Sequence, residues 1–166
     1  MLKNLILAHV YAVLVIGTFL GLVPASLCLT FGLHRIPVDP VQEYALQALG
    51  SLLAAGGGIL SYVCMMVFIL HGDGTAFPSD PPKRFVATGP YRFVRNPMYV
   101  GNLVLACGVG LVFQSLTYLT YAACLAVLTH LYVVAYEEPR LRRRFGDSYD
   151  AYCKAVNRWL TPILST

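Results

Sequence analysis

The longest uncharged segment of the chain runs from Met98 to Tyr136, 39 residues without a single Asp, Glu, Lys or Arg. As one α-helix it would measure roughly 58 Å at about 1.5 Å per residue, whereas the hydrocarbon core of a bilayer is about 30 Å thick. The segment must therefore fold back on itself as two membrane helices. Gln114 and Ser115 are the most polar residues near its centre and mark the predicted turn, so we expect spans at residues 97–114 and 115–136.

The composition also points to a membrane protein. Hydrophobic residues make up 57% of the sequence and charged residues only 12%, against roughly 25% charged residues in soluble domains. Two further uncharged runs cover residues 5–33 and 44–70, and the first is too long for the apolar part of a signal peptide, about 7–15 residues. Because a span takes about 20 apolar residues, we expect a single all-α membrane domain over residues 1–166 with four transmembrane helices.

Glycine and proline indicate where these helices bend or pack closely. The first run is longer than one span requires, so we expect it to tilt, to kink near Pro24 or to fray into the following loop. Gly56, Gly57 and Gly58 lie at the middle of the second span, where small side chains would let another helix approach closely.

Positive charge orients the predicted spans. Eleven of the twelve Lys and Arg residues lie before the first span, between the second and third, or after the fourth, and only Arg35 lies elsewhere. With four spans, all three of these segments share one side of the membrane, which the positive-inside rule identifies as cytoplasmic. We therefore expect an integral membrane protein with its N- and C-termini in the cytoplasm.

A basic amphipathic helix is predicted at residues 139–156. Pro139 suits the first turn of a helix, Gly146 is a point where the helix can break, and Trp159 is placed like an interfacial anchor. We expect this helix to lie on the cytoplasmic membrane surface, with its arginines turned away from the lipid. Its apolar face, at helical spacing, consists of Leu141, Phe145, Tyr149 and Tyr152.

Polar residues concentrate in residues 71–96 and 136–158, both on the predicted cytoplasmic side. The adjacent carboxylates of Glu137 and Glu138 would be costly beside a bilayer unless solvated or paired. They predict a ligand site, partners for nearby arginines, or favourable charge at the start of the next helix. Asn96 is a natural N-cap for the third span, ahead of Pro97.

The cysteines and histidines predict no metal site. The five cysteines form no Cys-x-x-Cys pair and four of them lie in apolar runs, which is typical of small buried residues. His9 and His130 lie in different predicted spans without an acidic residue nearby in the sequence, so we interpret them as packing residues.

From Gly72 to Pro162 the sequence resembles the membrane methyltransferases typified by isoprenylcysteine carboxyl methyltransferases and phospholipid N-methyltransferases. Gly72-x-Gly74 resembles the Gly-x-Gly that precedes the motifs of the phospholipid enzymes. The family's Arg-His-Pro-x-Tyr-x-Gly region is similar to Gly89-Pro90-Tyr91-Arg92 and Arg95-Asn96-Pro97-Met98-Tyr99-Val100-Gly101. Its C-terminal signature is similar to Glu137-Glu138-Pro139, Leu141, Phe145-Gly146, Tyr149, Tyr152 and Val156-x-Arg158.

The resemblance implies S-adenosylmethionine as cofactor and a lipid-like or membrane-embedded acceptor that enters from the bilayer, with no nucleic acid and no metal involved. It implies catalytic roles for Glu137, which would bind the cofactor's ammonium or ribose hydroxyls, for Tyr91, which would pack on the adenine or the cation, and for Arg92, which would hold a carboxylate or phosphate. The implied cofactor pocket consists of Gly72, Gly74, Lys83, Arg84, Phe85, Val86, Tyr91, Asn96, Pro97, Met98, Tyr99, Glu137 and Glu138.

Two positions depart from the family pattern. Asn96 stands where the family has histidine, and its amide keeps a donor and an acceptor but has no titratable ring. Val133 stands where the prenylcysteine enzymes have an arginine that serves the substrate, which disfavours a prenylcysteine carboxylate as acceptor. Two other functions stay open: an NADPH-dependent sterol-type reductase of similar architecture, and a non-enzymatic small membrane protein.

Overall fold

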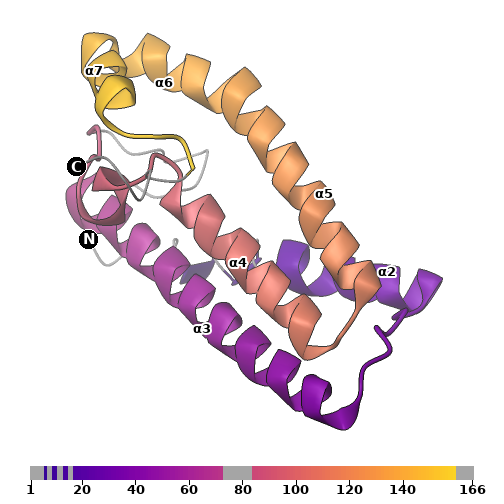
Figure 1. Cartoon of the computed structure of the whole chain (residues 1–166). Coiled ribbons are helices and arrows are strands. Elements are labelled where there is room, and N and C mark those ends of the chain that lie inside the picture. The colour runs from indigo at the N-terminus through magenta and orange to yellow at the C-terminus, as the bar shows by residue number, and fades with distance from the viewer. Residues whose placement is uncertain (1–5, 7–8, 11–12, 15–16, 73–83, 160–166) are drawn as a thin grey trace.

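The computed structural model describes residues 6, 9–10, 13–14, 17–72 and 84–159. Its regular elements are all helical, as predicted, and Figure 1 shows that the longest of them run alongside one another. In chain order they are the π-helix η1 (Gly17–Leu22), α2 (Val23–Phe31), α3 (Pro40–His71), the 3₁₀-helix η2 (Gly89–Arg92), α4 (Pro97–Val112), α5 (Leu116–Tyr132), the π-helix η3 (Val133–Glu137), α6 (Glu138–Phe145) and α7 (Asp147–Ala155).

Helix α3 begins four residues earlier than the predicted span because its first turn is capped. The side chain of Asp39 accepts a hydrogen bond from the Gln42 backbone N–H (2.9 Å), and the Gln42 side chain accepts one from the Asp39 N–H (3.4 Å). Pro40 occupies the first turn, where no amide hydrogen is needed. This capping box extends the helix into the polar segment ahead of the apolar run.

Helices α3 and α4 lie side by side along their length, with their backbones in contact (Figure 1). A Cβ placed on Gly57 would lie 2.5 Å from the Gly101 carbonyl oxygen, and one on Gly108 would lie 2.4 Å from the Ala54 nitrogen. The close approach predicted for the glycine triplet is confirmed at Gly57, whereas Gly58 has nothing within 4 Å. Small residues therefore set this helix pair, as in membrane helix interfaces generally.

The predicted turn between the third and fourth spans is confirmed. Helix α4 ends at Val112 and α5 begins at Leu116. Gln114 adopts a positive φ of 45°, and the Ser115 hydroxyl caps α5 by accepting a hydrogen bond from the Tyr118 N–H (3.1 Å). The hairpin thus reverses through one left-handed residue followed by a serine cap.

Within the described ranges, two helices are long and apolar enough to cross a membrane, α3 and the continuous helix Leu116–Phe145. The helical stretches Gly17–Phe31 and Pro97–Val112 are apolar but shorter, so membrane crossing there stays a prediction. The 30 residues of Leu116–Phe145 would extend about 45 Å. The charged end, from Glu137 onward, therefore projects beyond a hydrocarbon core of about 30 Å.

Pro139 lies in the first turn of α6, as predicted, but α6 is not a separate helix, because the chain stays helical from α5 through η3 into α6. Pro139 has no amide hydrogen and would leave an orphan carbonyl in a regular helix. The π-turn of η3 precedes it, with the Glu138 N–H bonded to the Val133 carbonyl five residues back. A second π-helix, η1, precedes Pro24, near which a kink is one of the expected alternatives. In both places a wider turn leads into the proline.

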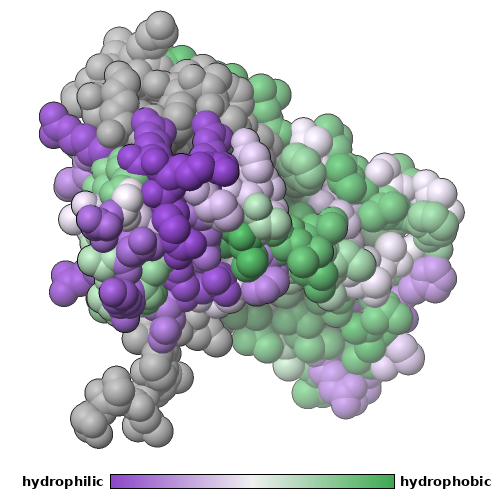
Figure 2. Space-filling view, turned by 90° about the horizontal axis from the view of Figure 1, so that it is seen from above, coloured by the Kyte–Doolittle hydropathy of each residue, from purple (hydrophilic) through white to green (hydrophobic). Residues whose placement is uncertain are grey.

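The break predicted at Gly146 is confirmed, since this residue has a φ of 52° and separates α6 from α7. Phe85 covers part of the apolar face that the sequence predicts to rest on lipid. Its ring centroid lies 5.4, 5.9 and 5.1 Å from those of Phe145, Tyr149 and Tyr152, respectively. Seen from above, hydrophilic side chains gather on the side of the molecule where α6 and α7 lie (Figure 2).

Candidate functional site

A tyrosine on α4 and a glutamate at the end of η3 meet across the helical hairpin. The Tyr99 hydroxyl donates to Oε2 of Glu137 at 2.8 Å. Pro97 opens α4 and so places Tyr99 in its first turn. Burial of Glu137 raises the pKa of its carboxyl, opposed by the hydrogen bond from Tyr99. Among the described residues Oε1 of Glu137 has no hydrogen-bond partner, which leaves one oxygen able to accept from a ligand.

Tyr91 lies beside this pair and is almost completely buried, with 6% of its surface exposed. Its ring packs on Phe68 (centroids 4.8 Å apart), and its backbone carbonyl accepts a hydrogen bond from the Tyr152 hydroxyl at 2.5 Å. Burial, reinforced by the Cys64 thiol and the Glu137 carboxylate, raises the pKa of Tyr91 well above its usual value. Apart from the Cys64 thiol, a weak partner, its buried hydroxyl has no hydrogen-bond partner among the described residues, a condition that native proteins usually relieve with water or a ligand.

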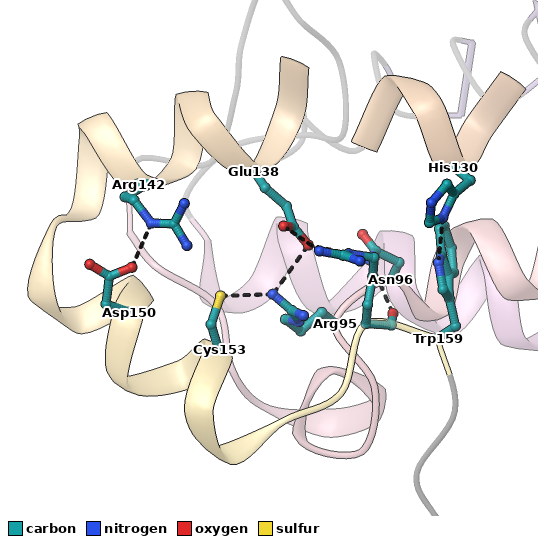
Figure 3. Close-up of polar contacts among 9 residues, drawn as sticks. Arg95, Asn96, His130, Glu138, Arg142, Asp150, Cys153 and Trp159 are labelled. Atoms are coloured by element: carbon teal, nitrogen blue, oxygen red, sulfur yellow. Dashed lines mark hydrogen bonds and ion pairs between the residues drawn. The ribbon is translucent and has the colours of Figure 1, made fainter. Parts of the chain in front are cut away.

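Glu138, the neighbour of Glu137, has both carboxylate oxygens engaged by arginines. Arg158 forms a bidentate pair with it, Nε to Oε1 at 2.7 Å and Nη2 to Oε2 at 3.0 Å. Arg95 adds a third contact, Nη1 to Oε1 at 3.1 Å (Figure 3). Burial would raise the pKa of Glu138, but the Arg158 hydrogen bonds and the positive charge of Arg95 lower it below its ordinary value. Of the predicted roles for the two carboxylates, the arginine partner therefore applies to Glu138.

The contacts around Glu138 also attach residues 156–159 to the start of α4. We name these residues the C-terminal strap. The Arg95 backbone N–H donates to the Asn157 carbonyl at 2.8 Å, and Arg95 Nη1 donates to the Cys153 sulfur at 2.9 Å (Figure 3). Asn96 occupies the N-cap position of α4, but its side chain makes no cap. That prediction is wrong, because the Asn96 amide instead donates to the Arg158 carbonyl at 3.1 Å.

Other residues of the implied pocket lie at the end of α3 and in residues 84–98. Gly72 is buried at the end of α3, and its carbonyl accepts a hydrogen bond from the Arg84 N–H at 3.1 Å. Val86 is buried in a cluster with Cys64, Val67 and Tyr91, and Met98 packs against this cluster. Pro97 is buried at the start of α4. Phe85 contacts the aromatic rings of α6 and α7, as described above. Gly74 and Lys83 lie outside the described residues.

Arg92 is separate from these groups. It is exposed at the end of η2, with its guanidinium 5.2 Å from the centre of the Phe93 ring. Within the described part of the chain it forms no ion pair with Glu137 or Glu138. The structure therefore brings Tyr91, Tyr99 and Glu137 together, joins Asn96 and Glu138 to the strap, and leaves Arg92 at the surface.

Sequence reasoning missed three participants, Arg158, Cys153 and Tyr152. Arg158 belongs to the C-terminal signature, and a buried carboxylate beside a membrane needs a cation. The positive charge of Arg158 could therefore have been used to predict its pairing with a glutamate. Nothing in the sequence pairs Cys153 with Arg95, or the Tyr152 hydroxyl with the Tyr91 carbonyl, because these contacts join residues about 60 positions apart.

An apolar groove of about 420 Å³ lies between α2 and α5, far from these residues along the helix. It is lined by Leu27, Phe31, His34, Leu116, Thr117, Thr120, Tyr121 and Cys124. Leu116 and Thr117 begin α5, whereas Glu137 follows its end. The groove is therefore not part of the candidate site.

The charge of the site suits a cationic ligand with hydroxyl groups. A half-buried carboxylate with one oxygen available, beside a buried tyrosine hydroxyl that needs a partner, can bind hydroxyl and ammonium groups.

Comparison with known proteins agrees with this chemistry. The model of the phospholipid methyltransferase family matches residues 45–148, well over half of the 166-residue chain. No curated protein and no solved structure matches the chain. The matched range contains α4, α5 and both glutamates, and the predicted resemblance is confirmed. Enzymes of this family use S-adenosylmethionine, which supports the methyltransferase over the reductase and the non-enzymatic alternative. The chain belongs to the phospholipid methyltransferase family and is a membrane methyltransferase that uses S-adenosylmethionine.

Proposed function

We propose that this enzyme methylates an amino group in the headgroup of a phospholipid, at a site formed by Tyr91, Tyr99 and Glu137. The observation that carries the proposal is the 2.8 Å hydrogen bond between Tyr99 and Glu137. It joins the two family motifs on α4 and η3, and both lie in the matched range. The acceptor class follows from the family, whose substrates are phospholipids.

Glu137 is the residue that holds the cofactor in this proposal. Tyr99 fixes Oε2, so Oε1 is aimed by a hydrogen bond that already exists before ligand binds. When bound, S-adenosylmethionine supplies an electrophilic methyl group on a sulfonium. The Tyr91 hydroxyl gains a hydrogen-bond partner stronger than the Cys64 thiol. Binding thus satisfies two polar groups that are already in place, which limits the ordering that binding requires.

The acceptor amine needs orientation more than it needs a strong base. A neutral amine nitrogen forms its bond to the methyl carbon while the carbon–sulfur bond breaks, and sulfur keeps the electron pair. The methylated ammonium then releases one proton to water. Asn96, which lacks a titratable ring and is bonded to the strap, plays no part in this proton transfer. Orientation alone can contribute about 7–11 kcal/mol.

The phospholipid reaches the site from the bilayer. In our proposal all four predicted spans cross the membrane, with α6, α7 and the strap on the cytoplasmic side. The positive charge of these segments supports that orientation. Helix α5 has exposed apolar side chains one to two turns before η3, including Val127 (60%), Leu128 (62%) and Leu131 (56%). Such a surface suits contact with lipid chains.

Binding measured on the purified, detergent-solubilised chain tests the site. We expect titration calorimetry to detect S-adenosylmethionine and its demethylated product, and we expect Glu137→Ala to weaken both by at least tenfold. Glu43→Ala is the matched control. Glu43 lies in the first turn of α3, away from the candidate site, and pairs with Arg35 at 3.3 Å. Wild-type affinity in Glu137→Ala would contradict the assignment.

Activity tests the reaction itself. The wild-type enzyme, supplied with a labelled methyl donor and phosphatidylethanolamine in mixed micelles, should label the headgroup nitrogen. Binding of a reduced nicotinamide cofactor without binding of S-adenosylmethionine would instead favour a reductase.

A further inference from the structure

A histidine within the apolar run of α5 is paired with the last described residue of the strap. Trp159 Nε1 donates to Nδ1 of His130 at 3.0 Å, and the two ring centroids lie 6.0 Å apart (Figure 3). The His130 side chain is exposed. The residue before Trp159 is Arg158, which the two hydrogen bonds to Glu138 hold in place.

This hydrogen bond fixes the protonation pattern of the neutral imidazole. An indole N–H can only donate, so Nδ1 of His130 must be the acceptor. The ring proton of neutral His130 is therefore on Nε2. Among the described residues no group accepts from Nε2. His130 thus presents a single N–H donor on a surface otherwise formed by apolar side chains such as Val127 and Leu131.

The distance from His130 to Glu137 along the helix is comparable to the thickness of one layer of the bilayer. It precedes Glu137 by seven residues, at most about 10 Å along the axis. The headgroup layer on each side is about 5–8 Å thick, half the difference between a bilayer of about 40–45 Å and its core of about 30 Å. Seven residues of helix are therefore long enough to cross this layer, so a lipid whose amine lies at Glu137 passes His130 on its way into the bilayer, and Trp159 is of the residue type enriched at membrane interfaces.

We propose that His130 and Trp159 form a subsite for an acyl ester carbonyl of the phospholipid acceptor, with His130 Nε2–H as the donor. The inference rests on the proposed function. The ester carbonyls of a glycerophospholipid lie between its headgroup and its chains, so a lipid whose amine reaches the cofactor site has a carbonyl near His130. Trp159 acts as a positioning residue, because its N–H keeps the imidazole in the donating tautomer.

The experiment compares diacyl and diether phosphatidylethanolamine as acceptors for the full chain in mixed micelles. The ether lipid has the same headgroup and chains but no carbonyl. For the wild type we expect KM to be roughly 2–10-fold lower for the diacyl lipid, the effect of one hydrogen bond. His130→Ala should make the two KM values equal without changing S-adenosylmethionine affinity. His130→Gln, which keeps an N–H donor, should retain part of the preference, and Trp159→Phe should reduce it.

Leu131→Ala is the control, since Leu131 is an exposed neighbour without a polar group, and its lipid preference should equal that of the wild type. Equal KM values for the two lipids in the wild type would overturn the subsite, and so would an unchanged preference in His130→Ala. Because the wild-type comparison needs no variant, misfolding of a variant leaves the test intact. Failure of the proposed function is a separate result, namely no methylation of either lipid.

Discussion

Arg158 contacts both carboxylate oxygens of Glu138, at 2.7 and 3.0 Å, while the adjacent Glu137 receives a hydrogen bond from Tyr99 instead. Neighbouring residues of a helix point about 100° apart, so the two glutamates contact different parts of the protein. Glu138 joins the C-terminal strap to the end of the α5–α6 helix. Glu137 faces α4, and its Oε1 has no hydrogen-bond partner among the residues that the structure describes.

Glu138→Ala should unfold at a markedly lower temperature than the wild type. Removing the carboxylate leaves Arg95 and Arg158 without their buried partner, which costs about 3 kcal/mol, the lower end of the usual range because the Arg158 side chain keeps 32% exposure. Thermal unfolding in detergent measures the effect. Asp150→Ala is the control, because its pair with Arg142 is solvent-exposed and should matter much less. Equal destabilisation by the two variants would show that the Glu138 network does not hold the strap.

The contribution of Glu138 to the free energy of unfolding should decrease at acidic pH. Its folded-state pKa is lowered, so its stabilisation is complete above the unfolded-state pKa of about 4.3 and is lost as the pH falls through the folded-state value. We expect the difference in unfolding temperature between the wild type and Glu138→Gln to stay constant from pH 7 to about pH 5 and to shrink below about pH 4.3. A difference that grows as the pH falls would contradict this sign.

Glu137→Gln should stabilise the cofactor-free protein at pH 7 and weaken cofactor binding. The folded-state pKa of Glu137 is raised, mainly by burial, so its ionised form opposes folding above that pKa. Glutamine accepts the same Tyr99 hydrogen bond without the charge. Unfolding temperature and titration calorimetry on the same preparation measure the two effects. Lower stability of the variant would show that the carboxylate has a structural partner.

Gly108→Ala should disrupt the α3–α4 pair. Its new Cβ would lie 2.4 Å from the Ala54 nitrogen, a backbone atom that moves only with the helix. Overpacking of this kind typically costs about 1–3 kcal/mol. Gly58→Ala is the matched control, because nothing lies within 4 Å of the added methyl group and alanine favours helix more than glycine does. An unfolding temperature that Gly108→Ala leaves unchanged would show that the two helices can move apart without loss of stability.

Much of the fold was predictable because the length of an apolar run can be read directly from consecutive residues. The uncharged run of residues 98–136 requires a hairpin, and the polar pair Gln114-Ser115 locates its turn. Pro97 and Gly146 mark helix boundaries through backbone constraints of their own. Pro139 occupies the first turn of α6, but the unbroken helix that leads into it from α5 was not predictable, because whether a proline ends a helix or follows a π-turn depends on the packing around it. Residues 1–5, 7–8, 11–12, 15–16, 73–83 and 160–166 lie outside the described structure, so the predictions there stay predictions.

The sequence by itself determined that this chain is a helical membrane protein and indicated a methyltransferase, because the length of an apolar run and short motifs can be read from consecutive residues. It also placed Glu137 and Glu138 beside the polar segment before α4. Only the tertiary structure decided how the two carboxylates differ, and that Asn96 serves the strap rather than the helix cap. Those outcomes depend on contacts between residues 20 to 62 positions apart. The physical reason is that a buried charge takes its role from whichever partner packing brings within hydrogen-bonding distance.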